Sequence, residues 1–245
     1  MSKHSKQDEK IIKKPLIIIA LVIVIATIII FILRYNVEGE KNIPFIITNI
    51  RIISTAQANM LENSQNDFNI IQKNDFYFYL EKNPKYKKED SISKITFENF
   101  NIEKLTDKGV INIYKPSLNA TLYSYTDEYK IENSISYNGS LNTSLPTLEI
   151  GNQGGTIGFS VALQDLGIYT KTDDTVTYDG TILSKLNLTN EDISVKISFD
   201  VIIENLSGKK FRSTLYFDLP TGNIIEEGRT FLDKNDFTDV VFKRF

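Results

Sequence analysis

The sequence predicts an all-β domain, an antiparallel β-sandwich that is one large or two small, behind a single N-terminal transmembrane helix. Two observations lead to this prediction. An uncharged apolar run fills Leu16–Leu33, and the chain after it carries many short stretches in which apolar and polar residues alternate. Turn residues separate these stretches, at the spacing typical of antiparallel sheets.

The apolar run has the length and composition of a membrane span. It holds one polar side chain, Thr27, and as a helix it is roughly 27 Å long, close to the hydrocarbon core of a bilayer. No pair of small residues follows Leu33, so a cleaved signal peptide lacks its cleavage site. We therefore expect residues 15–35 to be an uncleaved signal anchor that contacts the lipid bilayer through Leu16 to Leu33.

The flanking charges predict the orientation of this anchor. Five lysines lie in the tail of residues 1–14, whereas only three basic residues, Arg34, Lys41 and Arg51, lie within about twenty residues after the span. The positive-inside rule then places the N-terminus in the cytoplasm and the C-terminal domain outside, as in a type II bitopic protein of the cell membrane.

After the span, residues 36–44 are expected to be a connector that Gly39 and Pro44 keep from continuing the helix. The ectodomain is predicted to be residues 45–245. Its first strand should begin at Phe45, with Ile46, Thr48, Ile50 and Ile52 on one face, and the polar residues 54–67 should form a loop or one short helix. Further strands are predicted at 76–80, 95–100, 109–114, 121–125, 134–137, 157–163, 176–178 and 240–245, with a turn at Asn138-Gly139 and another at Asp179-Gly180.

Two patterns carry more information than the others. Odd-numbered residues of 195–203 and 211–219 are almost all apolar, which predicts a hairpin whose link is Asn205–Lys210. In 157–163, bulky residues alternate with Gly158, Ser160 and Ala162, as where another segment packs very close. The best candidate for a seam between two small sandwiches is the turn-rich stretch 140–146.

Composition excludes several kinds of chemistry. The chain has no cysteine, and its one histidine is His4 in the tail, so the ectodomain has no residues for a Ser-His-Asp triad, a thiol nucleophile or a histidine-ligated zinc. We predict no catalytic, cofactor-binding or metal-binding residue, no cofactor, and no enzymatic activity.

Four acidic clusters are candidates for calcium loops, but solvated turns are the favoured interpretation, and the run 233–239 fails the EF-hand spacing because Phe237 stands at its fifth position. They are Asp173, Asp174 and Asp179; Glu191 and Asp192; Glu226 and Glu227, which lie in the turn-rich run 219–228 that we expect at the rim; and Asp233, Asp236 and Asp239. Gly151–Gly155 is expected to be a tight turn rather than a phosphate loop. Lys82, Lys85, Lys87 and Lys88 crowd a loop that we interpret as a solvated turn.

The charge balance bears on the partners. Residues 36–245 carry 22 basic and 29 acidic side chains. An acidic exterior argues against nucleic acid, anionic lipid and anionic wall polymer as direct partners.

Several motifs also support a resemblance. Ile111–Ser117, Gly151–Thr156, Asp179–Thr181 and Leu219–Gly228, together with the connector 38–45, resemble a family of single-pass membrane proteins from low-GC Gram-positive bacteria, clostridia in particular, to which no activity is assigned. The resemblance covers most of the chain and implies a setting in the bacterial cell envelope.

Together these features predict a structural or protein-interaction role in the envelope, with an envelope protein as the partner. The alternative is a ligand-binding or carbohydrate-active β-sandwich, with or without assistance from calcium. The lack of histidine and cysteine favours the first.

Overall fold

The structure is a computed structural model, and it describes residues 4–117, 123–141, 148–172 and 180–245, without the side chains of 4–14. It contains two compact units, Met1–Lys41 and Asn42–Phe245. The predicted seam lies mostly in residues 142–147, outside the described residues, as do the predicted strand at 176–178 and Asp179 of the predicted turn.

The first unit is one helix, α1 (His4–Glu38). Its segment Pro15–Glu38 is 24 residues long with a mean hydropathy of 3.7, and is by length and composition able to cross a membrane. The helix ends where Gly39 adopts a φ of 68° and donates its N–H to the Tyr35 carbonyl over 2.8 Å, a left-handed C-terminal cap. The predicted connector therefore begins too early, because residues 36–38 still belong to the helix.

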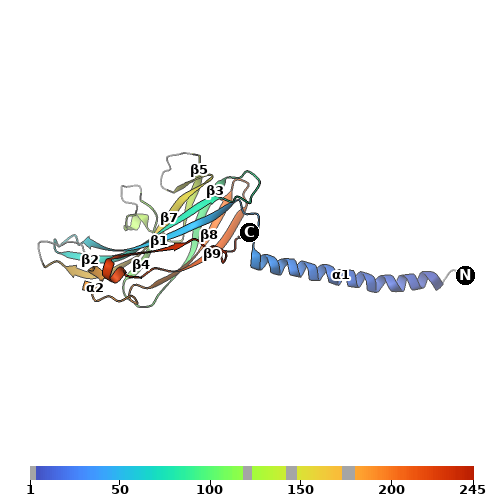
Figure 1. Cartoon of the computed structure of the whole chain (residues 1–245), viewed down its shortest axis with the longest axis horizontal. Helices are drawn as coiled ribbons and strands as arrows, with labels where there is room; N and C mark the ends of the chain where they lie inside the picture. The colour runs from blue at the N-terminus through green and yellow to red at the C-terminus, as the bar shows by residue number, and fades with distance from the viewer. Residues whose placement is uncertain (1–3, 118–122, 142–147, 173–179) are drawn as a thin grey trace. The chain divides into compact units, whose positions relative to one another are not determined.

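The second unit is a β-sandwich of two sheets, as the sequence predicts (Figure 1). The first sheet has the strand order β10-β1-β2-β7-β4, and the second has the order β11-β9-β8-β3-β5-β6. Neighbouring strands run antiparallel except β5 and β6, which run parallel. The bounds in the first sheet are β1 (Phe45–Met60), β2 (Asp67–Lys82), β4 (Val110–Tyr114), β7 (Gly154–Thr170) and β10 (Arg229–Lys234).

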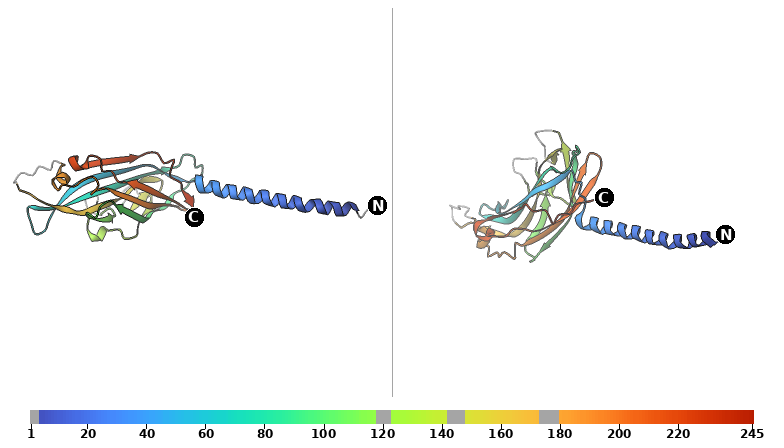
Figure 2. Two further views of the ribbon diagram at one scale, coloured as in Figure 1. Left: turned by 90° about the horizontal axis from the view of Figure 1, so that it is seen from below. Right: turned by 45° about the vertical axis from the view of Figure 1, so that its right-hand side comes forward.

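The second sheet contains β3 (Ile92–Lys104), β5 (Ser134–Ser140), β6 (Glu149–Gly151), β8 (Val195–Asn205), β9 (Lys210–Asp218) and β11 (Lys243–Arg244). Three short helical turns complete the described elements: η1 (Asp127–Tyr129), α2 (Ile182–Lys185) and α3 (Ile224–Glu227). The views in Figure 2 show the long, strongly twisted strands of the two layers.

Aromatic rings from both sheets fill the centre of the sandwich. Phe199 of β8 is fully buried, and its ring centroid lies 5.2 Å from that of Phe159 and 5.9 Å from that of Phe76, both in the other sheet. Edge-to-face pairs of this kind stabilise a core beyond the area that they bury. The predicted hairpin is confirmed, because the odd-numbered residues of 195–203 and of 211–219 are buried and its link lies at Asn205–Lys210.

Strand β1 differs from the prediction in two ways. The register shifts between Ile47 and Asn49, and this bulge moves the inward face from Phe45 and Ile47 to Ile50 and Ile52. Ile46 and Thr48 therefore do not share the face of Ile50. Residues 54–60 continue the strand instead of forming a loop or helix, because Ser54 is buried and donates a hydrogen bond to Asn74 over 2.5 Å.

Three other predictions need correction. Asn138 and Gly139 do not end a strand in a turn, because both pair with β6 inside β5. The last strand covers only Lys243–Arg244 rather than 240–245. The predicted strand at 121–125 is described only from Tyr123, which forms one isolated bridge to Pro116.

The small residues of β7 lie under a layer of tyrosines, which confirms the prediction of a close-packed segment. Ala162 packs in a buried cluster with Tyr114 and Tyr129. A Cβ atom on Gly158 would lie 1.9 Å from the Phe76 backbone carbonyl oxygen in β2 and 3.1 Å from the Tyr123 hydroxyl oxygen. A larger side chain at Gly158 would therefore clash first with the neighbouring strand and then with the covering segment.

Candidate functional site

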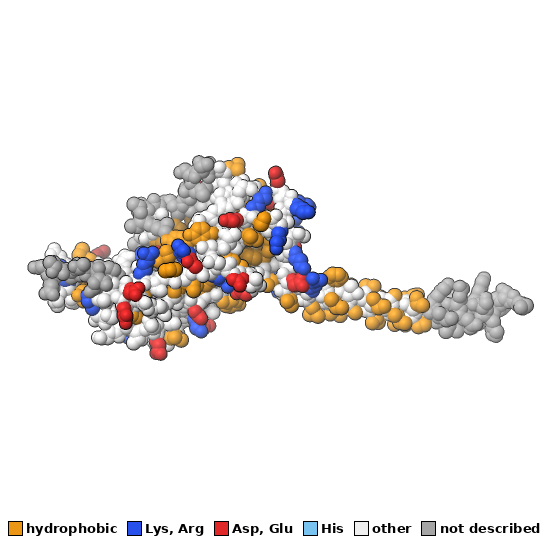
Figure 3. All heavy atoms as spheres, in the orientation of Figure 1, with side chains coloured by type: hydrophobic (Ala, Val, Ile, Leu, Met, Phe, Trp, Pro, Cys, Tyr) orange, Lys and Arg blue, Asp and Glu red, His pale blue; other side chains and the backbone are white. Residues whose placement is uncertain are grey.

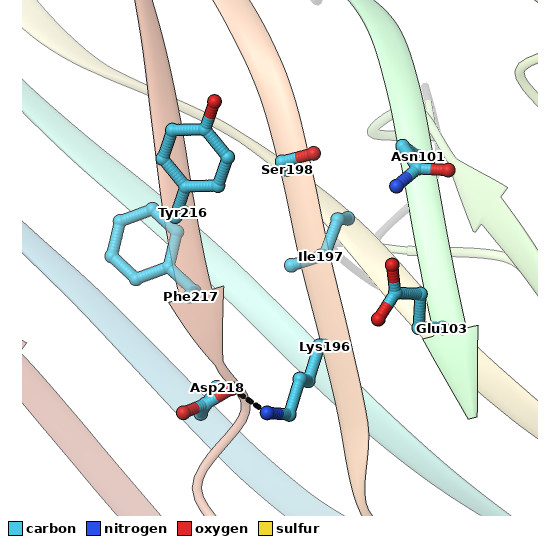
Figure 4. A pocket seen from close by; sticks show the side chains of 8 residues that line it. All are labelled: Asn101, Glu103, Lys196, Ile197, Ser198, Tyr216, Phe217 and Asp218. Carbon is cyan, nitrogen blue, oxygen red and sulfur yellow. Dashed lines mark ion pairs between the residues drawn. The ribbon is translucent and has the colours of Figure 1, made fainter. Parts of the chain in front are cut away.

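The candidate site is the outer surface of β3, β8 and β9 in the second sheet, where the register aligns side chains into rows across the three strands. One row is Asn101, Ser198 and Tyr216, and the next is Glu103, Lys196 and Asp218. Because successive side chains of a strand alternate between faces, these residues project outward while Ile197 and Phe217 point into the core. Figure 4 shows both rows.

The rows line a hollow of about 260 Å³. Tyr216 is 75% exposed, although it stands in the middle of a strand whose other face is core. The Lys196 Nζ atom lies 3.7 Å from a carboxylate oxygen of Asp218, an exposed ion pair that contributes little to stability. The surface therefore offers one aromatic face with hydrogen-bond donors and acceptors around it, which is chemistry for binding.

A fixed polar network adjoins the hollow. Asp200, 9% exposed, accepts hydrogen bonds from the Asn99 amide over 2.8 Å and from the Thr214 hydroxyl over 2.5 Å. Arg212 donates to Glu98 over 3.3 Å. A register shift in β3 places Asn99 there with a φ of 57°, a conformation that asparagine tolerates better than most residues. The network holds the strands beside the hollow in a defined arrangement.

A second cluster of titratable groups lies on the outer surface of the first sheet and is closed to solvent. Asp75 is 7% exposed and accepts hydrogen bonds from Ser160 over 2.7 Å and from Tyr125 over 3.4 Å. Burial raises the pKa of Asp75 above its ordinary value, and burial together with the neighbouring Asp75 carboxylate raises the pKa of Tyr77 to about 12. Ser160 is fully buried, and its hydrogen bonds with Asp75 and Tyr125 anchor the covering segment to the first sheet.

Three of the candidate acidic residues, Asp233, Asp192 and Asp239, have separate local partners. Asp233 forms two contacts with Arg51, of 2.6 and 2.8 Å, which hold the pKa of its carboxyl below the ordinary value. Asp192 accepts the Thr189 backbone N–H over 2.9 Å, and this hydrogen bond lowers its pKa. Asp239 pairs with Lys234 over 2.9 Å.

The remaining predicted positions do not form a site. Glu226 and Glu227 are exposed in α3, and Gly151–Gly155 forms the tight turn between β6 and β7, as expected. Asp173, Asp174 and Asp179 lie outside the described residues. Within the ranges that the structure describes, no three residues of the types His, Cys, Asp and Glu gather closely enough to hold a metal ion.

Sequence reasoning missed the two rows, although half of the signal was present. The alternation in the hairpin already places Lys196, Ser198 and Tyr216 on its outer face. The other half, the addition of Asn101 and Glu103, depends on β3 pairing with β8 across ninety residues of sequence, and no local pattern encodes this pairing.

The fold and the hollow define a β-sandwich with a surface suited to binding, preceded by a helix able to cross a membrane. No family model matches the chain, and neither the curated proteins nor the solved structures contain a significant match.

Proposed function

We propose that the protein is a type II bitopic membrane protein of a bacterial cell envelope, and that its sandwich lies outside the membrane and binds an envelope protein through the hollow of β3, β8 and β9. The apolar helix supports the anchoring, and the five tail lysines support the orientation. The assignment is to a binding module without enzymatic activity.

The exposure of Tyr216 is the observation that carries the proposal. Tyrosine is enriched at protein interfaces because its ring supplies a large rigid contact area and its hydroxyl a hydrogen bond. At 75% exposure on the outer surface of the sheet, its ring has most of its area left to bury against a partner. Ser198, Asn101 and Glu103 lie on one side of it, on β8 and β3, and offer the groups that a polar rim provides.

Site-specific cross-linking in intact cells tests the proposal. A photoreactive residue at Ser198, beside Tyr216, should give one defined adduct with an envelope protein, and Tyr216→Ala should abolish that adduct. The control is a photoreactive residue at Phe231, which is 62% exposed in the other sheet. The absence of an adduct at Ser198, or the same adducts at both positions, would contradict the proposal.

A small carbohydrate is the second candidate ligand, favoured by the size of the hollow, about 260 Å³ with an aromatic wall. Titration with soluble fragments of envelope glycans should then change the nuclear magnetic resonance signals of Tyr216 and Ser198 in the wild type. If Tyr216→Ala binds the same fragments equally well, the hollow is not their site.

A further inference from the structure

The charges of the sandwich are separated along its length. The end where β1 begins is defined by residues 42–47, 81–94, 138–141, 148–156, 204–212 and 243–245, which the register brings together through pairs such as Phe45 with Lys82 and Ile92 with Asn205. We call it the basic end. It contains ten basic residues: Lys82, Lys85, Lys87, Lys88, Lys94, Lys209, Lys210, Arg212, Lys243 and Arg244. In Figure 3, Lys and Arg side chains gather on this end of the sandwich.

Only five acidic residues lie at the basic end: Glu81, Glu89, Asp90, Glu149 and Glu204. The basic end therefore carries a net charge of +5, while the rest of residues 36–245 carries −12. Some of these charges already have partners, and among the basic residues Arg212 pairs with Glu98 over 3.3 Å. Asp90 accepts a hydrogen bond from Asn205 over 2.6 Å, and Glu204 pairs with Lys210 over 3.5 Å. The acidic net charge of the whole domain argues against anionic lipid as a partner, but it does not show this separation of charge between the basic end and the rest of the domain.

The loop lysines of this end are available to an external anion. Lys82, Lys85, Lys87 and Lys88 are all exposed, and among the described residues no carboxylate oxygen lies within 4.0 Å of their amino groups. A loop that served only as a solvated turn would need no such concentration of one charge, because like charges repel one another.

Two exposed apolar side chains belong to the basic end, and one of them, Leu206, lines the same hollow as Lys82. Leu206, at the tip of the turn between β8 and β9, is 71% exposed, and Leu141, just after β5, is 85% exposed. A cationic surface with single protruding apolar residues matches a lipid headgroup layer, in which the cations meet phosphates and the apolar residues enter the acyl boundary.

The basic end also has a hollow of about 580 Å³, lined by Lys82, Ser91, Gln153 and Ser207 together with Glu89 and Asp90. Its amino, amide and hydroxyl groups are donors that suit phosphate oxygens.

The tether attaches to this same end. Six residues separate Glu38, the last residue of α1, from Phe45, the first of β1, and a fully extended stretch of that length reaches at most roughly 25 Å. Because the tether is short, the bilayer that holds the span is present at a high effective concentration for binding to the basic end.

We propose that the basic end binds the anionic phospholipid headgroups of the bilayer in which α1 is anchored. The contact fixes the orientation of the sandwich on the membrane and leaves the hollow at Tyr216, on the outer surface of the second sheet, open to a partner. This inference rests on the proposed membrane anchoring.

A single fluorescent label tests the contact, because the chain contains no cysteine and an introduced one is unique. The full-length Leu206→Cys variant is labelled with an environment-sensitive fluorophore and reconstituted into vesicles of phosphatidylcholine, or of phosphatidylcholine with phosphatidylglycerol. In the anionic vesicles we expect a blue-shifted emission and a roughly twofold loss of quenching by iodide, both reversed at 1 M salt, where the Debye length is about 3 Å. Asn63→Cys, in the turn between β1 and β2 at the other end, is the matched label and should not respond.

Two charge variants complete the design. Lys85→Gln, Lys87→Gln and Lys88→Gln together should abolish the response, whereas Lys108→Gln, Lys130→Gln and Lys185→Gln, with the same change in net charge, should retain it. Equal quenching in the two kinds of vesicle, or equal effects of the two triple variants, would overturn the proposal. If soluble polyphosphate gives protein in neutral vesicles the same blue shift and the same loss of iodide quenching as anionic vesicles do, the basic end is a site for soluble polyanions. That result would overturn the proposal of a lipid contact. Carbonate extraction of the same vesicles reports the anchoring separately.

Discussion

The aromatic centre of the sandwich makes a quantitative prediction at Phe199. Its side chain is fully buried, and its ring lies within 6.0 Å, centroid to centroid, of six others: Phe76, Phe78, Phe97, Phe100, Phe159 and Phe217. Replacement of a buried Phe by Ala costs about 3–5 kcal/mol. Rings held from both sheets cannot easily collapse into the cavity, and each aromatic pair adds about 0.5–1.5 kcal/mol. We therefore expect about 4–5 kcal/mol for Phe199→Ala.

Urea unfolding of a soluble fragment beginning at Asn42, followed by circular dichroism, measures this cost. With a slope of about 2–3 kcal/mol per molar urea, the midpoint should fall by roughly 1.3–2.5 M. Ser198→Ala is the matched control, because Ser198 lies on the opposite face of the same strand, and it should shift the midpoint little. Equal shifts for the two variants would mean that the alternation of the hairpin does not describe its packing.

Three further predictions concern a turn, a buried acid and the N-terminus. Gly154→Ala should destabilise the fragment by roughly 1–3 kcal/mol, since Gly154 has a φ of 129° and the added Cβ would lie 2.4 Å from the Leu80 carbonyl oxygen. The control Gly208→Ala should cost clearly less, because Gly208 has a φ of 75° but no atom lies within 4 Å of its Cβ. A lower unfolding midpoint for Gly208→Ala than for Gly154→Ala would contradict the turn geometry. Burial raises the pKa of Asp75 in the folded state, so this residue favours folding most at low pH and loses that contribution as the pH rises through its folded pKa. The Asp75→Asn variant should therefore be more stable than the wild type at pH 7 but not at pH 3. A stability difference that stays constant between these two pH values would refute a buried carboxyl that titrates. Mass spectrometry of the protein from membranes should find the N-terminal tail intact, because no small-residue site follows Leu33; a mature N-terminus beyond Leu33 would show that the helix is a cleaved signal.

Sequence patterns predicted the elements whose structure depends on residues close together in the chain. The hairpin at Val195–Leu219 and the apolar helix were visible because a long run of one periodicity has a single explanation. Strand β1 was misread because a bulge after Ile47 exchanges its two faces, and its continuation through Ser54 depends on a hydrogen bond to Asn74 in the next strand. The sequence of β1 alone contains no pattern that predicts the bulge or the hydrogen bond.

The candidate site was less predictable than the fold. The alternation of the hairpin places Tyr216 on the outer face of β9, but its exposure depends on which segments cover that face, and the sequence does not show them. The basic end is a similar case, because Lys82, Lys210 and Lys243 belong to three distant segments that meet only through the register of the sheets. Net charge is a property of the sequence, whereas the distribution of charge is a property of the fold.

Cysteine labelling in intact cells tests the central proposal, an envelope protein with its sandwich outside the membrane, most directly. The chain has no cysteine of its own, so Asn63→Cys reports on the sandwich and Ser5→Cys on the N-terminal tail. A membrane-impermeant maleimide should label Asn63→Cys in intact cells and Ser5→Cys only after the membrane is permeabilised. Labelling of Ser5→Cys in intact cells, with Asn63→Cys protected until permeabilisation, would contradict the proposed orientation and the envelope role that depends on it.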